Sequence, residues 1–481
     1  MCIVCQTISV GAAALTGILP IATPEPAVVT PSLTAVSQSA TQPAPIGGKT
    51  CNKIGRIRNV SGGSFRCTAV GNRQIWRRSG VAAITTTTTA TAGTISPDSS
   101  RKDWTGLVTP RASLADSRDC QLKEATPNTV NSIGFPLFAE RIPSTGSPKI
   151  NVVYLDFPDA PARTRDFDPV TEFQKTYQRD SDEYLAAMSY ETHSPQWSVH
   201  PNVVRFPRAV AEYQMVAPSR DPRLWYQFAG EAIAHVDAEV DFTNSAAAIF
   251  IAHPDVPRSL MNAISALPRP PGWGYPSAEG AVFNSVVVTP PDPNYTVIRP
   301  WQILVHEYGH LMGLVDLYAY PGTGIDQGSP TGVFAMMGSG MPNAEVMGWN
   351  RWLLNWLHES EIRCVQNSGT TVHALFPISS RQRGEKLVVL PTSNSRAVVV
   401  EAKRHDHYCV GCTSGVQVYT VDTTIENGRG PIQIAVKAGQ QRPPTVKNAI
   451  LTLGENVNVD GVSVTVTDSG PQGQLVTIVR P

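Results

Sequence analysis

The chain has 481 residues, which is too long for one ordinary hydrophobic core and predicts two or three folded units. Charged residues make up 16% of the sequence and the formal net charge is zero, so neither nucleic acid nor an anionic membrane is expected as a partner. The 40 prolines and 37 glycines favour loops, linkers and β-structure over long helices. Low charge with many Thr, Ser and Pro residues is typical of an exported protein.

The first 20 residues contain an apolar stretch of signal-peptide length, although no Lys or Arg precedes Lys49. We therefore expect residues 1–20 to be an atypical export signal, with a short buried helix as the alternative. Residues 21–47 predict a disordered Pro/Thr/Ser-rich spacer, and residues 80–115 predict a Thr-rich linker. No other segment is apolar enough over about 18 residues to span a membrane. The sequence predicts a secreted, extracellular protein, with cell-surface association left open.

Residues 48–79 predict a small separate module, in which the Gly62-Gly63 turn divides two short polar strands. The segment is too small to hold a core unless Cys51 and Cys67 form a disulfide. It resembles short Cys-containing modules that are attached to exported bacterial proteins. Its Lys and Arg side chains could bind an anionic cell-wall polymer, and a solvated cationic surface is the alternative.

Residues 116–360 predict an α+β domain with a mixed sheet and one long helix that carries the chemistry. Continuous apolar runs predict strands buried on both faces, whereas the helices follow the 3.6-residue period. The expected strands are 150–157, 246–252 and 281–288, the last at a sheet edge, and the expected helices are 169–188, 221–238 and 300–314.

Residues 361–481 have a different sequence pattern, which predicts an all-β, sandwich-like domain. Short β-branched segments follow one another at the spacing of a β-sandwich, separated by turn residues. The expected strands are 371–378, 385–391, 396–403, 415–422, 432–436, 448–453, 461–467 and 474–479.

The segment 306–316, HEYGHLMGLVD, is the most informative part of the chain. His306 and His310 are four residues apart, so both imidazoles project from one face of a helix and can meet one metal ion. Glu307 is one residue further round the helix, where its carboxylate can reach a water held by the metal rather than the metal itself. This pattern predicts a catalytic zinc site in which Glu307 is the general base.

A catalytic zinc needs a third protein ligand and one open position. Gly313 allows the chain to leave the helix with a positive φ, and the turn brings Asp316 back as the favoured third ligand. Glu345 is the alternative, since some zincins use a Glu from a later helix. Either Tyr318 or Tyr320 could donate a hydrogen bond to the developing oxyanion, or simply pack.

The motif and its surroundings resemble the immune-inhibitor-A family of secreted bacterial metalloendopeptidases. The resemblance rests on HEYGHLMGLVDLY at 306–318, FAMMGSG at 334–340 and NRWLLNWL at 350–357. Upstream, VVYLDFPDAP and YLAAMSYETHSPQWSVHPNVVRFP are also similar, so the resemblance covers about residues 145–360.

This resemblance implies a metzincin-like zincin fold, secretion, and hydrolysis of a protein or peptide substrate. It carries over the two histidines and Asp316 as zinc ligands and Glu307 as the base. Met337 corresponds to the Met-turn residue, which forms a hydrophobic floor under the ligands. The chain differs from the commonest pattern at Val315, where Pro is frequent, and at Leu317, where Glu often follows the Asp.

Six of the 8 cysteines remain if Cys2 and Cys5 leave with the signal, and an even number suits an oxidising compartment. Six cysteines allow fifteen sets of pairings. We expect a Cys120–Cys364 bond in addition to the Cys51–Cys67 bond of the small module. The segment 405–412, HDHYCVGC, could hold a small structural metal, although disulfide bonding there is favoured.

The sequence therefore predicts a secreted zinc metalloendopeptidase. Two alternatives remain open. One is a non-catalytic cell-surface binding protein with a structural zinc, against which the presence of Glu307 argues, because a structural site has no use for a base. The other is a zinc amidase acting on cell-wall peptide, which the basic 48–79 module would suit.

Overall fold

The computed structural model describes most of the chain from residue 102 onward. The described ranges are 102–125, 131–137, 141–164, 166–216, 221–262, 265–269, 274–279, 299–338, 344–406, 408–409 and 411–481, with the backbone alone of 57–60, 63–70, 73–78, 282–283 and 286–289. The proposed export signal, the 21–47 spacer and Cys51 lie outside the described residues.

Three short strands form the small N-terminal sheet, which belongs to a compact unit separate from the one that holds residues 97–481. β1 (Ile57–Val60), β2 (Gly63–Val70) and β3 (Arg73–Arg78) pair in an antiparallel meander. The sequence predicted only two strands. The third strand is β3, whose residues 75–76 pair with residues 67–68 of β2.

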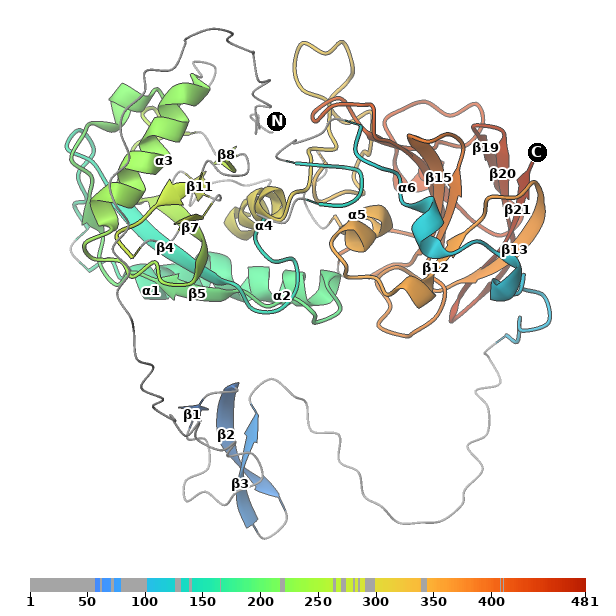
Figure 1. Ribbon diagram of the computed structural model, residues 1–481, viewed down its shortest axis with the longest axis horizontal. Helices are drawn as coiled ribbons and strands as arrows, with labels where there is room; N and C mark the ends of the chain where they lie inside the picture. Colours follow the sequence, from blue (N-terminus) through green and yellow to red (C-terminus); the bar gives the residue numbers. More distant parts are fainter. Residues whose placement is uncertain are drawn as a thin grey trace, which may run out of the picture. The chain divides into compact units, whose positions relative to one another are not determined.

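A six-stranded mixed sheet organises the first part of the large unit (Figure 1). Its order is β5-β4-β7-β11-β8, and β6 also pairs with β4. All these strands run parallel to their neighbours except β8, which is antiparallel to β11. The strands are β4 (Lys149–Asp156), β5 (Gln196–Val199), β6 (Val204–Arg205), β7 (Ser245–Ala252), β8 (Ser265–Ala266) and β11 (Val286–Thr289).

The segment 281–288 was wrongly predicted to be one edge strand. It contains β10 (Val282–Phe283), which pairs with β9 (Tyr275–Pro276) in a separate two-stranded sheet, and β11. β11 lies inside the large sheet between β7 and β8. Its sequence, VVVT, is β-branched at every position, which suits a strand paired on both sides.

Helices cover both faces of this sheet, which explains the unbroken apolar runs of β4 and β7. On β4, Val152 and Tyr154 pack into one core, whereas Val153 and Leu155 pack into another. The first core receives α2 (Arg179–Met188) and α4 (Pro300–Leu311), and the second receives α3 (Pro222–Val236) (Figure 1). α2 continues α1 (Pro169–Phe173) through one π-helical turn, Gln174–Gln178.

α4 is buried along its whole length, so its polar side chains face protein rather than water. Pro300 occupies the first helical turn, and the Gln302 side chain accepts a hydrogen bond from the Arg299 N–H at 2.9 Å. The helix ends at Leu311, and Gly313 follows with φ +101°. The expected helix and its glycine turn are therefore present.

Two further sheets face each other in the C-terminal part and share one apolar core. The first contains β12 (Ile362–Cys364), β14 (Leu387–Pro391), β15 (Arg396–Lys403), β16 (Gly415–Asp422), β17 (Ile432–Ile434) and β18 (Ile450–Leu451). The second contains β13 (Gly369–Leu375), β21 (Gly473–Arg480), β20 (Val462–Gly470) and β19 (Asn456–Val459). Each expected strand is present, and β12 and β19 were not predicted.

Short helical segments connect these layers. They are the 3-10 turns Arg111–Ser113, Ser117–Cys120, Val210–Tyr213 and Glu359–Glu361, and the helices α5 (Gly348–Leu353) and α6 (Val446–Ala449). Cys120 and Cys364 form the expected disulfide, with Cα atoms 5.6 Å apart. This bond ties the segment before the mixed sheet to β12 of the C-terminal part.

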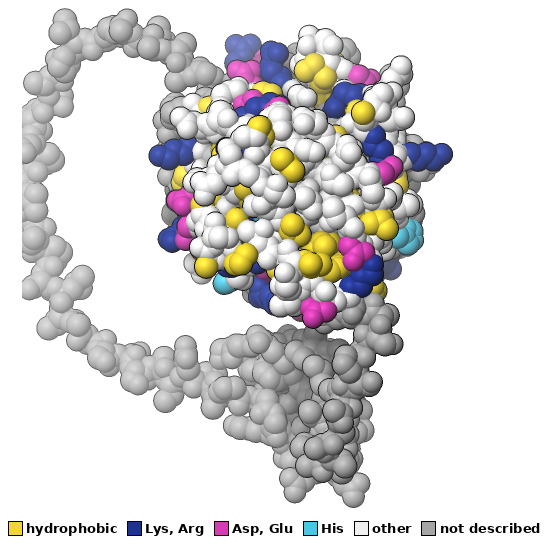
Figure 2. Space-filling model, turned by 90° about the vertical axis from the view of Figure 1, so that its right-hand side faces the viewer, with side chains coloured by type: hydrophobic (Ala, Val, Ile, Leu, Met, Phe, Trp, Pro, Cys, Tyr) yellow, Lys and Arg dark blue, Asp and Glu magenta, His cyan; other side chains and the backbone are white. Residues whose placement is uncertain are grey.

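The described surface agrees with the balanced composition. On the face that Figure 2 presents, Lys and Arg side chains are intermixed with Asp and Glu rather than gathered into one charged region. Within the described residues, no helix has the length and apolar character needed to cross a membrane.

Candidate metal centre

Three of the predicted site residues meet at the end of α4. One ligand atom each from His306, His310 and Asp316 lies within 4.8 Å of the others, and all three side chains are at most 1% exposed. The Asp316 Oδ1 atom is 3.1 Å from Nε2 of His306 and 3.3 Å from Nε2 of His310. Two nitrogens and one carboxylate oxygen facing a common point form a donor set that suits zinc.

The backbone fixes which nitrogen of each histidine faces that point. Nδ1 of His306 donates to the Met336 carbonyl at 2.9 Å, and Nδ1 of His310 donates to the Leu314 carbonyl at 2.8 Å. A neutral imidazole that donates from Nδ1 presents the lone pair of Nε2. In both histidines Nε2, rather than Nδ1, therefore faces the common point, and His310 has to lose its Nε2 proton when a metal binds.

The carboxylate and the imidazoles of this group stabilise each other's charged forms. Burial alone would lower the pKa of His310, but the Asp316 carboxylate outweighs it, with a smaller contribution from Glu307, and raises the pKa to about 9. Burial opposes ionisation of Asp316 as well, yet the two imidazoles hold the pKa of this carboxyl below its usual range. A divalent cation would replace the imidazolium proton as the partner of the carboxylate.

Glu307 lies between α4 and the antiparallel strand β8. Its side chain is 1% exposed, and Oε2 accepts a hydrogen bond from the Ala266 N–H at 2.6 Å. The strand thus orients the carboxylate, and its charge is felt at His310. Local sequence pattern could not reveal this contact, because 41 residues separate the partners.

Met337 packs under the helix, as the Met-turn prediction required. A Cβ atom added to Gly309 would come within 2.6 Å of the Met337 sulfur, so a larger residue there would require the methionine side chain to shift. The Met337 carbonyl also accepts the Leu317 N–H at 2.7 Å, which ties this segment to the turn that carries Asp316.

Glu345, the alternative third ligand, lies in a different cluster. Its Oε2 accepts a hydrogen bond from Lys403 Nζ at 2.9 Å, and Oε1 is 3.5 Å from an Arg351 nitrogen. Two cations therefore already neutralise this carboxylate. The geometry favours Asp316.

The two tyrosines that follow Asp316 make different contacts. The Tyr320 hydroxyl donates to Asp316 Oδ2 at 2.6 Å, so it holds this carboxylate in place. Tyr318 is buried, with its ring 6.3 Å from that of His306 and 5.5 Å from that of Tyr320. Packing is the role that these contacts support for Tyr318.

The second candidate metal cluster is partly outside the described residues, since His407 and Val410 are not described. Cys409 and Cys412 are bonded to each other, which is the arrangement we favoured over a metal. Among the described residues, the only group that could hold a metal is the one at the end of α4.

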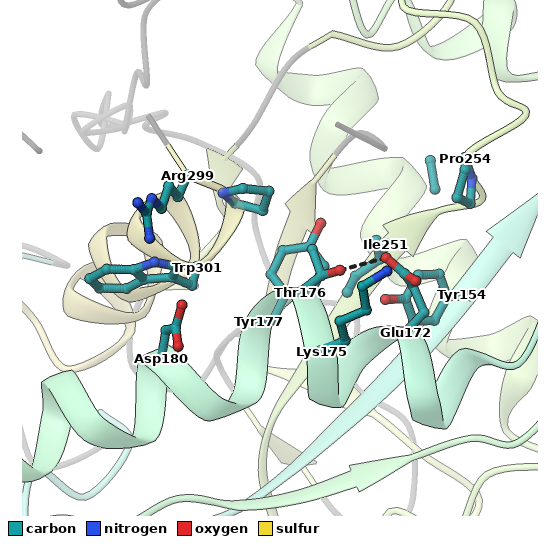
Figure 3. Close-up of a pocket in the computed structure, with 12 residues that line it drawn as sticks. Tyr154, Glu172, Lys175, Thr176, Tyr177, Asp180, Ile251, Pro254, Arg299 and Trp301 are labelled. Carbon is teal, nitrogen blue, oxygen red and sulfur yellow. Dashed lines mark hydrogen bonds between the residues drawn. The ribbon is translucent and has the colours of Figure 1, made fainter. Parts of the chain in front are cut away.

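A cavity of about 340 Å³ lies at the carboxyl ends of β4 and β7, between the π-helical turn and the start of α4 (Figure 3). Charged residues of both signs line it together with Tyr154 and Trp301. The Tyr154 hydroxyl and Trp301 Nε1 are buried without a hydrogen-bond partner among the described residues. None of the metal-centre residues lines the cavity, so it is separate from that centre. Sequence reasoning missed it because both aromatic residues look like ordinary core.

No known protein family matches the chain, and no curated protein sequence resembles it closely enough to count as a relative. The resemblance drawn from the sequence therefore rests on the motif residues, and the function has to be argued from the site.

Proposed function

We propose that the protein is a secreted zinc-dependent endopeptidase, with His306, His310 and Asp316 as the zinc ligands and Glu307 as the general base. One observation carries the proposal: three ligand atoms converge in a buried group, and both imidazoles already donate from Nδ1 to backbone carbonyls. The mixed sheet, with five parallel strands and one antiparallel strand, and the buried helix α4 are compatible with a zincin domain, which supports the metzincin-like assignment.

A zinc ion in this group would lower the pKa of a water molecule and polarise the scissile carbonyl. The chain's own contribution is proton transfer. Glu307 accepts the proton of the attacking water and then delivers it to the leaving amine. Its hydrogen bond to the Ala266 N–H keeps the carboxylate oriented between these two steps.

Burial favours one alternative, a non-catalytic protein with a structural zinc, because all four side chains are at most 1% exposed. Because Glu307 is buried, a peptide can reach it only if the residues that cover it move. Against this alternative, a structural zinc site is usually closed by four protein ligands, whereas the described residues supply three. The number of ligands and the position of Glu307 favour the peptidase.

The Cys120–Cys364 disulfide supports the proposal of export, since such bonds persist mainly in oxidising compartments. The exported location in turn suits a substrate met outside the cell, and we propose proteins or peptides as that substrate.

The test compares the wild-type protein with Glu307→Gln and with Glu183→Gln, an exposed glutamate on α2 that serves as the matched control. The Gln side chain keeps an oxygen for the Ala266 N–H but cannot accept the water's proton. We expect Glu307→Gln to bind zinc normally and to hydrolyse a mixed peptide library about 100- to 10,000-fold more slowly. A chelator should abolish wild-type hydrolysis.

The outcomes distinguish a catalytic zinc site from a structural zinc site and from the absence of a metal site. Zinc binding without any peptide hydrolysis in the wild type would favour the structural alternative. Full activity of Glu307→Gln at a full zinc complement would exclude Glu307 as the base, and a wild-type protein that binds no zinc would remove the metal centre itself.

A further inference from the structure

The turn that carries Asp316 touches a loop from the C-terminal sheets. This loop, residues 423–431, connects β16 with β17. The Asp316 N–H donates to Asn427 Oδ1 at 2.7 Å, across 111 residues of sequence. Asn427 is half-buried, so it is not a core residue. Its hydrogen bond to Asp316 places it at the edge of the candidate metal centre.

The backbones of the two segments also pair. The Tyr320 N–H donates to the Gly428 carbonyl at 2.8 Å, and the Gly428 N–H approaches the Asp316 carbonyl at 3.4 Å. Ala319 and Arg429 form an antiparallel bridge. The loop therefore runs beside the segment from Asp316 to Tyr320, like a short additional strand.

Asn427 also reaches the carboxylate of Asp316 indirectly. Its Nδ2 donates to the Tyr320 hydroxyl at 3.1 Å, and that hydroxyl donates to Asp316 Oδ2 at 2.6 Å. The two oxygens of Asp316 thus have separate tasks: Oδ2 receives the tyrosine, while Oδ1 faces the two histidines. Such a division directs one oxygen alone towards the metal.

Gly428 makes this close approach sterically feasible. It has φ +70°, and a Cβ atom there would lie 2.2 Å from a ring carbon of Tyr320. The loop backbone therefore lies directly against the tyrosine ring. Asn followed by Gly is the pair expected where a tight turn requires positive φ, and here it also places the amide of Asn427 over the tyrosine hydroxyl.

We propose that the 423–431 loop is part of the metal centre and that Asn427 is a positioning residue, which fixes Asp316 through its N–H and through Tyr320. This inference rests on the proposed metal site. By linkage, a metal that binds better when the loop is docked must also hold the loop more firmly in place. The C-terminal sheets would then control metal affinity, and would not merely be attached to the catalytic part.

The experiment measures the zinc and cobalt dissociation constants of the full chain by competition with a chromophoric chelator. The variants are Asn427→Ala, Tyr320→Phe and the double variant, with Asn458→Ala on the exposed side of β19 as the matched control. Loss of a residue that orients a ligand typically weakens metal binding about 10- to 100-fold, which we expect for Asn427→Ala. The double variant should lose less than the product of the single effects, because Asn427 acts partly through Tyr320.

The visible spectrum of bound cobalt supplies a readout that a purely structural role would not change. We expect an altered spectrum in Tyr320→Phe, since freeing Oδ2 changes how the carboxylate binds, and an unchanged spectrum in Asn458→Ala. Tyr320→Phe keeps the ring that packs on Gly428, so it remains informative if Asn427→Ala fails to fold.

The outcomes separate this inference from the proposed function. If the wild type binds neither metal, the metal centre itself is wrong. If the wild type binds zinc and both single variants bind it within twofold of the same affinity, the positioning role is overturned. Protection of residues 423–431 from hydrogen exchange on adding zinc would support the reciprocal effect, and unchanged exchange there would contradict it.

Discussion

Two of the buried charged clusters among the described residues of the large unit differ in how their charges are balanced. The first is the metal group, His306, His310 and Asp316. The second, which we call the ionic network, consists of Glu345, Arg351, Glu401 and Lys403, all at most 2% exposed. Both contain carboxylates out of contact with water, so each must neutralise them in some way.

The ionic network neutralises itself. Lys403 Nζ is 2.9 Å from Glu345 and 2.8 Å from Glu401, and the Tyr419 hydroxyl donates to Glu401 at 2.9 Å. Burial would lower the pKa of Lys403, but the two carboxylates outweigh it and raise the pKa above its usual range. The lysine stays charged, and its neighbours need no further cation.

The metal group contains no such lysine. Its carboxylate meets two imidazoles and a tyrosine hydroxyl, and the histidines can be neutral when a divalent ion supplies the positive charge. A buried acid next to Lys or Arg is thus a structural group, whereas a buried acid next to two correctly oriented histidines can be a ligand. That difference separates Glu345 from Asp316 more clearly than sequence spacing does.

The largest effects should come from truncating the acid in each cluster. Asp316→Ala removes a bond to the ion and should weaken zinc affinity by more than about 100-fold, beyond the loss seen for residues that only orient ligands. Glu345→Ala should leave zinc affinity unchanged but lower the free energy of unfolding by about 3–5 kcal/mol, because it leaves Lys403 with one buried carboxylate fewer. Metal content after dialysis and urea unfolding measure the two effects. The reverse pattern would make Glu345 the ligand.

Removing Lys403, one of the two cations of the ionic network, tests the same comparison from the other side. Lys403→Met should lower the free energy of unfolding by about 3–5 kcal/mol, since Glu401 loses its lysine partner and Glu345 keeps only Arg351. Lys447→Met, at an exposed position, is the control and should change stability by no more than about 0.5 kcal/mol. We expect both variants to bind zinc as the wild type does. A large loss of zinc affinity in Lys403→Met would mean that the clusters are coupled.

Local sequence pattern predicted what local geometry determines. The i, i+4 histidines on α4, the glycine turn at 313 and most strands of the C-terminal part follow from the period of a helix or strand and from turn residues. Composition could not predict long-range pairing. Glu345 and Lys403 are 58 residues apart, and Asp316 and Asn427 are 111 apart.

Strand position in the sheet was also beyond the sequence pattern. The segment 281–288, which contains β11, was expected at an edge, yet β11 pairs with β7 on one side and with β8 on the other. The antiparallel β8 has only two residues, Ser265 and Ala266, which carry no strand signal of their own. It was therefore missed, and with it the contact that orients Glu307.

Another buried histidine, His193, lies outside both clusters and provides the smallest expected effect. It is 0% exposed, and its Nε2 is 3.0 Å from the hydroxyl of Tyr308, which stands on α4 between His306 and His310. Within the described residues no carboxylate pairs with this imidazole, and burial lowers its pKa from 6.5 to about 4. His193 is therefore neutral where His310 is charged in the absence of metal.

The sign of the pH effect follows from this shift. Between pH 6.5 and 4 the unfolded chain binds a proton at this position that the folded chain does not, so acid favours unfolding. We expect the free energy of unfolding to fall by about 3 kcal/mol more in the wild type than in His193→Gln across this range, and to differ little in its slope above pH 7. Gln keeps an acceptor for Tyr308 but does not titrate. Urea unfolding of both proteins at several pH values measures the difference. The other titratable groups are the same in both proteins, so their contributions cancel. Parallel curves down to pH 4 would mean that His193 becomes protonated within the fold, and would place a charge partner near it.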